Sequence, residues 1–321
     1  MSHRPKFVPT GYQVARKLGS GQTSHVYLTQ HGRLGQVALK LPRDELHTQP
    51  VLRRMFENEV QITLGLDDEY VVKALDGFPT GEQAFLALEL CPGGTLDQLL
   101  LGKGRLELNI ASKLVLEVAQ GLEHSHSRQV LHRDVKPANV FLTAEGNAKL
   151  GDFGTGIFLT DGKRLEEQVG TAFYMAPEVF EGKPATVQSD VYSLGVLAYE
   201  VIAGQRPFVG STYEELMLQH LTSLPRNLQN VRQDMSKELN NVVARAMSRD
   251  PSKRFGTVRE FMQTYSAVSG VPLNKTQDAT LTTGRGSRPR TQERSVTKTA
   301  ARQPESQPSK GLFGWFKRGK K

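Results

Sequence analysis

Eight consecutive residues combine a carboxylate, an ammonium group and a side-chain amide at short intervals. The run covers residues 132–139 and reads HRDVKPAN. When a phosphate group passes to a hydroxyl, a carboxylate must orient and deprotonate that hydroxyl, and we predict this role for Asp134. Lys136 can then reach the transferred phosphate, and Asn139 can bind a metal ion from the same loop. A polar turn without chemistry would not need this arrangement, so the run indicates a site for phosphoryl transfer.

A second carboxylate follows at a fixed distance. Asp152 begins the tripeptide DFG, 13 residues after Asn139. A hard ion such as Mg²⁺ prefers carboxylate and phosphate oxygens, and Asp152 is therefore the predicted metal ligand beside Asn139. The tripeptide alone has no diagnostic value. Its distance from the run at 132–139 is what indicates that Asp152 belongs to the same site.

The N-terminal part of the chain contains a glycine turn and a lysine that could hold phosphates. Residues 19–26 read GSGQTSHV, and two glycines let backbone N–H groups approach phosphate oxygens. Such a turn alone is typical of any hairpin. The apolar run VALK follows and ends in Lys40, which could also be a strand end that reaches solvent. Behind the glycine turn, Lys40 resembles a lysine that holds phosphates, and the spacing typical of that resemblance favours Glu59 over Glu57 as its anionic partner.

The elements around these residues divide the chain into two parts. Short apolar runs predict strands at 11–18, 25–30, 36–41, 71–75, 84–90 and 148–150. Spacing of three and four residues predicts helices at 50–66, 96–101, 111–126, 191–203, 213–220, 239–247 and 258–267. We therefore predict an α+β protein with a small β-rich lobe followed by a larger, mostly helical lobe.

In this order, the motifs resemble those of the eukaryotic-like (Hanks-type) Ser/Thr protein kinases, over about residues 12–268. The resemblance includes the APE tripeptide at 176–178 and the SDVYSLG run at 189–195. It implies the bilobal protein kinase fold, with an N-lobe at about 12–90, a C-lobe at about 91–268 and an extension at 1–11. It also implies transfer of the ATP γ-phosphate to protein Ser/Thr hydroxyls, with autophosphorylation. The residues that make up these motifs are most similar to those of soluble bacterial members of the family.

The same resemblance assigns the site residues. The catalytic residues would be Asp134, Lys136, Lys40 and Asn139. The metal ligands would be Asn139 and Asp152, with Mg²⁺ as the ion and Mn²⁺ as a second candidate. The residues that bind ATP would be Gly19, Ser20, Gly21, Val26, Ala38, Lys40, Glu59, Glu89 and Cys91. The backbone of Glu89 and Cys91 would contact adenine, with Leu88 guarding the pocket, whereas Ser24 stands where the family usually has a third glycine.

The resemblance further implies contacts that support the site. Thr171 would hydrogen-bond Asp134 and Lys136, and together with Lys136 it indicates an alcohol as the acceptor. Asp190 would hydrogen-bond the backbone of the catalytic loop, and Glu178 would form a buried ion pair with Arg254.

Arg133 usually pairs with a phosphorylated residue in the segment between 152 and 178. Here the corresponding region holds Glu166 and Glu167. Our hypothesis is that one of them supplies the anion permanently. A solvated, charged loop is the alternative.

Two other functions compete with this interpretation. A catalytically inactive scaffold of the same fold should lack Lys40, Asp134 or Asp152, and the sequence has all three. A small-molecule phosphotransferase should lack the segment that ends at Glu178 and the helix of Asp190. The sequence has both, so protein substrates are expected.

Charge sets the last part of the chain apart. Residues 272–321 hold twelve basic and three acidic residues, a net charge of +9, whereas the whole chain has +8. We predict that 269–321 is a disordered basic tail, rich in Thr and Ser. Its aromatic and basic end at 310–321 could contact an anionic membrane surface or a protein partner, or the tail could merely aid solubility. Nucleic acid is not an expected partner, because no binding fold accompanies the charge.

Cysteine content and hydropathy bear on the location of the protein. The single cysteine, Cys91, excludes an internal disulfide and suits a reducing compartment. We find neither a signal peptide nor an apolar run of membrane-spanning length. The protein is therefore expected to be cytoplasmic, with peripheral membrane contact through its tail as an option.

Overall fold

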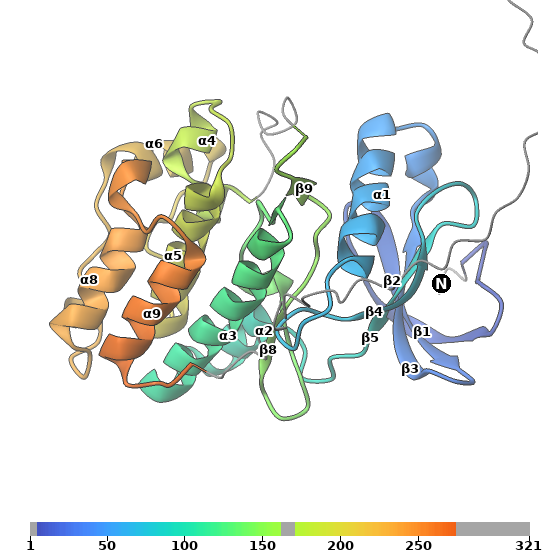
Figure 1. Ribbon diagram of the computed structural model, residues 1–321, viewed down its shortest axis with the longest axis horizontal. Helices are drawn as coiled ribbons and strands as arrows, with labels where there is room; N and C mark the ends of the chain where they lie inside the picture. The colour runs from blue at the N-terminus through green and yellow to red at the C-terminus, as the bar shows by residue number, and fades with distance from the viewer. Residues whose placement is uncertain (1–4, 162–170, 274–321) are drawn as a thin grey trace, which may run out of the picture. The chain divides into compact units, whose positions relative to one another are not determined.

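A five-stranded antiparallel sheet forms the N-terminal part of the protein. The computed structural model describes residues 5–161 and 171–273. The strands lie in the order β1-β2-β3-β5-β4. Their bounds are β1 Tyr12–Ser20, β2 Ser24–His31, β3 Gly35–Pro42, β4 Ala74–Phe78 and β5 Phe85–Glu89. Helix α1, Pro50–Leu64, lies against this sheet and is preceded by the short helix η1, Asp44–His47 (Figure 1).

Strand alternation separates the two faces of this sheet. Val37 and Leu39 of β3 are fully buried and pack with other apolar residues on one face. Ala38 and Lys40 therefore lie on the opposite face, because successive side chains of a strand point to opposite sides. On β2, Val26 is directly opposite Lys40 in the register. Paired residues share a face, so Val26, Ala38 and Lys40 lie together on the side away from the apolar cluster.

The sequence of α1 explains both its start and the position of Glu59. Pro50 occupies the first turn, where its missing N–H is not needed. Phe56 and Val60 are buried and pack with Leu86 of β5. Glu59 is adjacent to Val60 on this buried side of the helix and is 1% exposed. Packing of the apolar side of α1 against the sheet thus places the Glu59 carboxylate between the helix and the sheet.

The rest of the described chain is mostly helical. Its helices are α2 Leu96–Lys103, α3 Leu108–Ser127, α4 Pro177–Phe180, α5 Val187–Ala203, α6 Tyr213–Thr222, α7 Leu228–Val231, α8 Lys237–Ala246 and α9 Val258–Ser269. Three single-turn helices are η2 Pro137–Asn139, η4 Ala172–Tyr174 and η5 Pro251–Lys253. Two small pairs of strands join them: β6 Val130–Leu131 with β9 Ile157–Phe158, and β7 Val140–Leu142 with β8 Ala148–Leu150.

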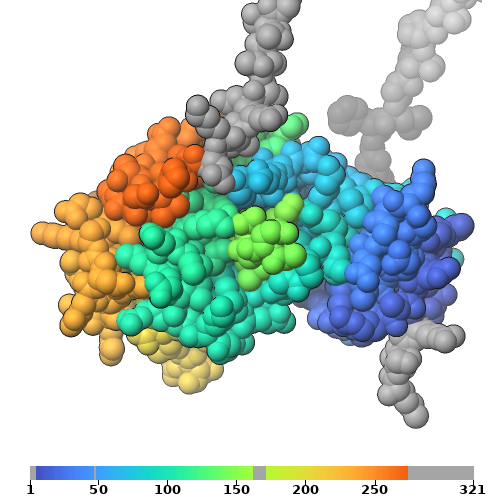
Figure 2. All heavy atoms as spheres, turned by 90° about the horizontal axis from the view of Figure 1, so that it is seen from below, coloured from blue at the N-terminus to red at the C-terminus, as the bar shows by residue number. Residues whose placement is uncertain are grey.

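Helix α5 forms the centre of the helical region. Most of its residues are buried, which is expected of a helix that is apolar on all sides. It packs between α3 and α8, and α9 lies against α3 and α8 (Figure 1). A Cβ at Gly195 would come within 2.8 Å of Ala246, so glycine allows α5 and α8 to approach closely. Viewed from below, the sheet residues (blue) and α8 with α9 (orange) lie at opposite ends of the described part (Figure 2).

The prediction of a strand at 71–75 was wrong for residues 71–73 and correct for the last two residues. Strand β4 begins at Ala74, and Val71 forms a single bridge to Leu150 of β8. The backbone N–H of Val72 donates to the Leu150 carbonyl (2.9 Å), and Leu150 donates to Tyr70 (2.7 Å). Val71 is buried in the core of the helical region, whereas Ala74 and Leu75 belong to β4 and pack with the apolar clusters of the sheet.

The other predicted elements are present with bounds that differ by a few residues. The expected sheet-rich N-terminal region and helical C-terminal region are both found. The pairs β6–β9 and β7–β8, except for β8 itself, were not predicted. Within the described residues, no helix is both long and apolar enough to cross a bilayer.

Candidate active site

The loop at 132–139 is held in place by a buried carboxylate from α5. Asp190 is 1% exposed and accepts hydrogen bonds from the backbone N–H groups of His132 and Arg133, both at 2.9 Å. His126 of α3 lies 2.8 Å from the same carboxylate. Burial alone would raise the pKa of Asp190, but its hydrogen bonds, first that with His126, hold the pKa below its ordinary value. The expected contact between Asp190 and the loop backbone is therefore present.

Arg133 has a left-handed backbone conformation, with φ of 64°. Such a conformation costs about 1–3 kcal/mol for a residue other than glycine. The bond from its N–H to Asp190 helps to stabilise the conformation. Its side chain turns to the next segment, where Nε donates to the Thr155 carbonyl at 2.7 Å.

His132 connects the loop to the DFG segment, a role that the sequence analysis missed. Its ring lies 4.6 Å from the ring of Phe153, and Nε2 lies 3.1 Å from the carbonyl oxygen of Gly151. Thr155 donates its hydroxyl proton to the His132 carbonyl at 3.1 Å. Neither residue type signals this contact in the sequence. Only the pairing of β6 with β9 brings the two segments side by side.

Both oxygens of the Asp134 carboxylate are held by neighbouring donors. Oδ1 accepts from the backbone N–H of Thr171 at 3.0 Å. Oδ2 accepts from Asn139 Nδ2 at 3.0 Å and lies 2.6 Å from Lys136 Nζ. Lys136 also donates to the Thr171 hydroxyl at 2.6 Å. Thr171 thus contacts both predicted partners, although it reaches Asp134 through its backbone rather than its hydroxyl.

Asn139 is 4% exposed, and its amide nitrogen has a second bond to the Asp134 carbonyl at 2.8 Å. The nitrogen is therefore fully committed to Asp134. Its oxygen has no hydrogen bond to the described residues and remains available as a ligand for a cation.

Lys40, Glu59 and Asp152 come from three separate elements and meet at one point. Lys40 forms an ion pair with Glu59 and lies 3.2 Å from Asp152 Oδ1. The structure pairs Lys40 with Glu59 as predicted, whereas Glu57 lies near Arg53. The Oε2 atom of Glu59 is buried and has no hydrogen-bond partner among the described residues.

The pKa values of this cluster are strongly shifted. Burial raises the pKa of Glu59 to about 7, against the attraction of Lys40. The charge of Lys40 lowers the pKa of Asp152 to about 2. Burial alone would lower the pKa of Lys40, but the charges of Asp152 and Glu59 outweigh it and raise the pKa. Lys40 is therefore charged at neutral pH, and so is Asp152.

The glycine turn lies between β1 and β2, next to Val26 and Lys40 in the register. Gly21 donates its N–H to the Ser24 carbonyl at 2.8 Å, which closes the turn. A Cβ at Gly19 would have no neighbour within 4 Å, and one at Gly21 would have only the Ser24 carbonyl at 3.9 Å. The packing of the chain does not require glycine at either position. Ser20 lies on the outside of the turn, with its hydroxyl 3.0 Å from a ring nitrogen of His25.

The end of β5 and the connection after it carry the residues predicted to contact adenine, Glu89 and Cys91. The Glu89 carboxylate accepts from Lys149 Nζ and from the backbone N–H of Lys73, both at 2.7 Å. Leu88 is opposite Ala38 of β3. Cys91 is half-buried, and burial raises the pKa of its thiol to about 11, so the thiol is protonated at neutral pH.

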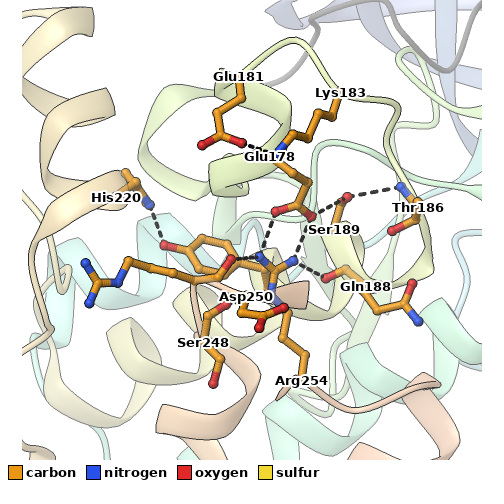
Figure 3. A network of polar contacts seen from close by, with 12 residues as sticks. Glu178, Glu181, Lys183, Thr186, Gln188, Ser189, His220, Ser248, Asp250 and Arg254 are labelled. Carbon is orange, nitrogen blue, oxygen red and sulfur yellow. Dashed lines mark hydrogen bonds and ion pairs between the residues drawn. The ribbon is translucent and has the colours of Figure 1, made fainter. Parts of the chain in front are cut away.

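Glu178 and Arg254 form the expected buried ion pair (Figure 3). Two nitrogens of Arg254 donate to the two carboxylate oxygens, each at 2.7 Å. Ser189 donates to Glu178 at 2.8 Å, and Arg254 also donates to the Gln188 carbonyl at 2.8 Å. Burial alone would raise the pKa of Glu178, but Arg254 and Ser189 hold it below its ordinary value. This pair fixes the end of the segment that follows Thr171.

Some predicted residues lie outside the described part of the chain. They include Glu166 and Glu167, proposed as partners of Arg133, and the whole segment from 274 to 321. Within residues 5–161 and 171–273, no cluster of three or more His, Cys, Asp or Glu side chains is arranged to hold a metal ion. A metal at Asp152 and Asn139 would thus need oxygens from another molecule.

Comparison with known proteins gives consistent relatives. A probable serine/threonine-protein kinase of Clostridium perfringens is 30% identical over 270 residues, 83% of this chain and 39% of the relative. Serine/threonine-protein kinase PknA of Corynebacterium glutamicum is 32% identical over 276 residues (82% and 57%). Serine/threonine-protein kinase PknB of Mycobacterium tuberculosis is 31% identical over 265 residues (80% and 42%). The chain therefore spans between 39% and 57% of the length of these relatives.

The profile of the protein kinase domain matches residues 12–265, which includes every residue of the site described above. The sheet, the helical region and the order of the motifs agree with the bilobal fold of that family. The chain belongs to the protein kinase family and is similar to its bacterial Hanks-type serine/threonine members.

Proposed function

We propose that this protein is an ATP- and Mg²⁺-dependent protein kinase that phosphorylates Ser and Thr hydroxyls. The observation that carries the proposal is the fixed geometry of Asp134. Its carboxylate is oriented by Asn139, Lys136 and Thr171, which come from both sides of the site. A hydroxyl placed against this carboxylate would find a proton acceptor, and the adjacent ammonium group would face the transferred phosphate.

The residues of the sheet fit ATP. Gly19 and Gly21 occupy positions where the chain itself has room for a Cβ, so an external group explains the glycines better than packing does. Backbone N–H groups in such a turn bind phosphate oxygens. Lys40 is held toward the same face by Glu59 and Asp152, and it would bind the α- and β-phosphates. Val26 and Ala38 lie on that face and would contact the base, with backbone groups of Glu89 and Cys91 at its edge.

The donor set also fits a divalent cation. The Asp152 carboxylate and the uncommitted oxygen of Asn139 are hard ligands of the kind that Mg²⁺ prefers. When bound, the ion would neutralise charge on the phosphates. Asp152 remains ionised down to low pH because Lys40 lowers its pKa to about 2. Mn²⁺ is a second candidate for the same ligands.

The roles of the remaining residues follow from their contacts. Asp134 would orient the acceptor hydroxyl and take up its proton as the hydroxyl oxygen bonds to the γ-phosphorus of ATP, while the bond from that phosphorus to the bridging oxygen of the β-phosphate breaks and ADP leaves. Lys136 is shared between Asp134 and Thr171, so it lies where the γ-phosphate meets the acceptor. Asn139 has two tasks: its nitrogen holds Asp134 and its oxygen faces the cation. Each task can be disturbed separately by mutation.

Transfer of ³²P from ATP–Mg²⁺ to a generic basic protein tests the proposal. We expect incorporation on Ser and Thr, a loss of at least about 10²-fold in Asp134→Asn, and no transfer when EDTA removes divalent ions. Asp67→Asn is the matched control, because Asp67 forms only an exposed ion pair with Lys73. Transfer that survives Asp134→Asn would contradict the proposed mechanism.

We also propose that the kinase phosphorylates itself on its basic tail. The segment from 272 to 321 contains seven Thr residues, and each phosphate would add about −1.5 to −2 charges. About five phosphates would cancel the net charge of +9. Mass-spectrometric mapping of the active protein and of Asp134→Asn tests this, and the proposal fails if the two proteins carry the same tail phosphates.

For Arg133 we propose a permanent anionic partner, Glu166 or Glu167, in place of a phosphorylated residue. A dephosphorylated enzyme should then be active. The double change Glu166→Gln/Glu167→Gln should lower activity, and full activity of that variant would argue for a merely solvated loop.

The end of the tail, 310–321, is proposed to contact an anionic membrane surface or a protein partner. Each basic residue near an anionic surface contributes about 1 kcal/mol. Co-sedimentation with phosphatidylserine liposomes, with and without residues 310–321, separates these options. Equal sedimentation of both proteins would end the membrane option and leave a protein partner or a tail that merely aids solubility.

A further inference from the structure

A hollow opens on the helical region between α5, α6 and α8. Its volume is about 490 Å³, and the connections that follow α6 and α8 line it as well. Three of the lining residues, His220, Ser248 and Asp250, are labelled in Figure 3. Among the described residues that line it, none belongs to the catalytic loop, the DFG segment or the sheet. A hollow of this size can accommodate a small organic molecule, and the proposed phosphoryl transfer does not use it.

Part of the lining is apolar. Phe208, Val243 and Met247 are buried side chains that line the hollow. Leu224, in the connection after α6, also lines it and is 78% exposed, although it is a large aliphatic residue. An exposed aliphatic side chain beside a hollow with buried apolar walls offers a contact for the apolar part of a ligand.

Cations outnumber carboxylates around this hollow. Arg226, Arg249 and Lys253 line it together with a single carboxylate, that of Asp250. None of the three cations forms an ion pair with the described residues. Asp250 is engaged locally, because its Oδ1 accepts from the backbone N–H and the hydroxyl of Ser252 at 3.0 and 2.7 Å. The lining therefore has an excess of two positive charges, which favours an anion.

Two buried side chains of the lining have donors without a partner. Tyr199 of α5 is 3% exposed, and its hydroxyl forms no hydrogen bond with the described residues. Asn240 of α8 is 9% exposed and accepts at Oδ1 from the Leu228 N–H at 3.0 Å. Its Nδ2 atom forms no hydrogen bond with the described residues. Buried donors are usually satisfied, and the oxygen atoms of a ligand in the hollow would satisfy both.

The cations lie close to these donors. Burial raises the pKa of Tyr199, and the nearby charge of Arg226 acts in the opposite direction. Arg249 Nη1 donates to the carbonyl oxygens of Leu221 and Thr222 at 3.2 and 3.0 Å. These bonds fix its guanidinium at the end of α6 without neutralising it. An anion in the hollow would thus meet fixed positive charge and a hydroxyl donor together.

We propose that this hollow binds a phosphate monoester that carries an apolar organic group, and that Arg226, Lys253 and Tyr199 contact the phosphate. A phosphate monoester has a charge of about −1.5 to −2 at neutral pH, which matches the excess positive charge of the lining. Guanidinium groups bind phosphate oxygens in pairs, and the apolar walls would contact the organic group. The inference concerns a second binding site and does not depend on the proposed kinase activity.

Titration with phenyl phosphate tests the inference. The full chain is treated with a phosphatase, which is then removed, and a non-hydrolysable ATP analogue with Mg²⁺ fills the proposed nucleotide site. Binding is followed by the NMR signals of the probe. We expect saturable binding with Kd of about 10⁻⁴ M. Inorganic phosphate lacks the apolar group and phenol lacks the charge, so each should bind at least about tenfold more weakly.

Three variants identify the residues responsible. Arg226→Gln and Lys253→Gln should each raise the Kd of phenyl phosphate about five- to tenfold, because each removes one charge-assisted contact. Tyr199→Phe should raise it about fivefold and leave the midpoint of urea unfolding unchanged, because the hydroxyl has no partner in the protein to lose. A hydroxyl with a purely structural role would show the reverse, a lower midpoint and an unchanged Kd.

The control is Arg259→Gln, the same chemical change at an exposed ion pair with Glu123, outside the hollow. Its Kd should equal that of the unchanged protein. The inference is overturned if no saturable binding occurs below about 10⁻² M. It is overturned as well if the ATP analogue abolishes binding, since the probe would then occupy the nucleotide site. Equal affinity for phenyl phosphate and inorganic phosphate, or equal Kd in all variants, would show unspecific attraction to surface cations and reject the site.

Discussion

Two buried ion pairs lie in different regions of this protein, and they are built in opposite ways. Between sheet and helix α1, Lys40 meets Glu59, whose Oε2 atom has no partner among the described residues. In the helical region, Arg254 meets Glu178 through two parallel bonds. There both carboxylate oxygens are satisfied, and Ser189 adds a further donor.

The pKa values follow this difference. Burial dominates at Glu59 and raises its pKa to about 7, whereas bonding dominates at Glu178 and lowers its pKa. The saturated pair has no bonding capacity left and can serve only the structure. The unsaturated pair holds its cation on the face of the sheet where phosphate binding is proposed. In this protein, the buried ion pair with an unsatisfied oxygen, Lys40 with Glu59, is the pair proposed to take part in catalysis. The pair with all its bonds satisfied, Arg254 with Glu178, stabilises the structure.

Loss of Arg254 should have the largest effect on stability. In Arg254→Met, Glu178 stays buried without a cation, and we expect the free energy of unfolding to fall by about 3–5 kcal/mol. Urea denaturation followed by circular dichroism measures it. Arg259→Met is the matched control, because Arg259 forms an exposed ion pair with Glu123 at 3.0 Å, and it should cost less than about 1 kcal/mol. Equal losses of unfolding free energy in Arg254→Met and Arg259→Met would contradict the structural role assigned to the buried pair.

Loss of Lys40 should act on catalysis instead. We expect Lys40→Met to lower kcat/KM by about 10²–10³-fold, since it removes the preorganised charge that is proposed to bind the phosphates. At pH 6 its free energy of unfolding should change by only about 1 kcal/mol, because Glu59 can take up a proton. Lys73→Met, which breaks an exposed pair with Asp67, serves as the control.

The pH dependence of Lys40→Met gives a sign to check. Without Lys40, the pKa of Glu59 in the folded protein lies even further above its value in the unfolded chain. The folded state then binds the proton more tightly, so stability is greatest below about pH 4.5 and is lost as pH rises through the folded pKa. Stability that increases from pH 6 to pH 8 would contradict the burial of this carboxyl.

His220 provides the smallest and most specific test. It is fully buried, and its Nδ1 atom lies 2.7 Å from the Tyr192 hydroxyl oxygen. Burial lowers the pKa of His220 to about 4. The unfolded chain therefore binds a proton more tightly, so this stability is complete above about pH 6.5 and is lost as pH falls toward 4. Between pH 7 and pH 5.5 we expect a loss of about 1 kcal/mol that is absent in His220→Gln.

His220 also sharpens the comparison. Its Nε2 atom lacks a partner among the described residues, as Oε2 of Glu59 does, but it lies in the supporting region. If His220→Gln keeps full kcat/KM, a buried atom without a hydrogen-bond partner is not by itself a sign of a catalytic group. It would then be such a sign only in a charged pair such as Lys40 and Glu59.

The sequence predicted the parts of the site that lie close together along the chain. Asp134, Lys136 and Asn139 lie on one loop, and their spacing is set by the chemistry they share. The pairing of Lys40 with Glu59 was predicted as well, because the distance of Glu59 from the following apolar segment matches the spacing of the family that the motifs resemble.

Contacts between distant segments were not predictable in the same way. Tyr199 and Asn240 line one hollow only because α5 and α8 pack against each other. The contact of His132 with Phe153 depends on strands of two residues, which are too short for a period to appear. The start of the segment at 71–75 misled the prediction. Two valines, Val71 and Val72, are equally expected in a buried strand of a sheet and in an extended segment that is buried against a helical region.

The bonds from Asp190 to the catalytic loop have a consequence for the order of folding. The residues they join are separated by 57 and 58 positions in the chain. Contacts at such separation close a long loop and form late, after local helices and hairpins. A chain with all its helices in place but α5 not yet docked would carry the complete motif and no active site. We therefore expect the proposed activity only after α5 has docked, so that activity would report this docking more directly than any measure of secondary structure.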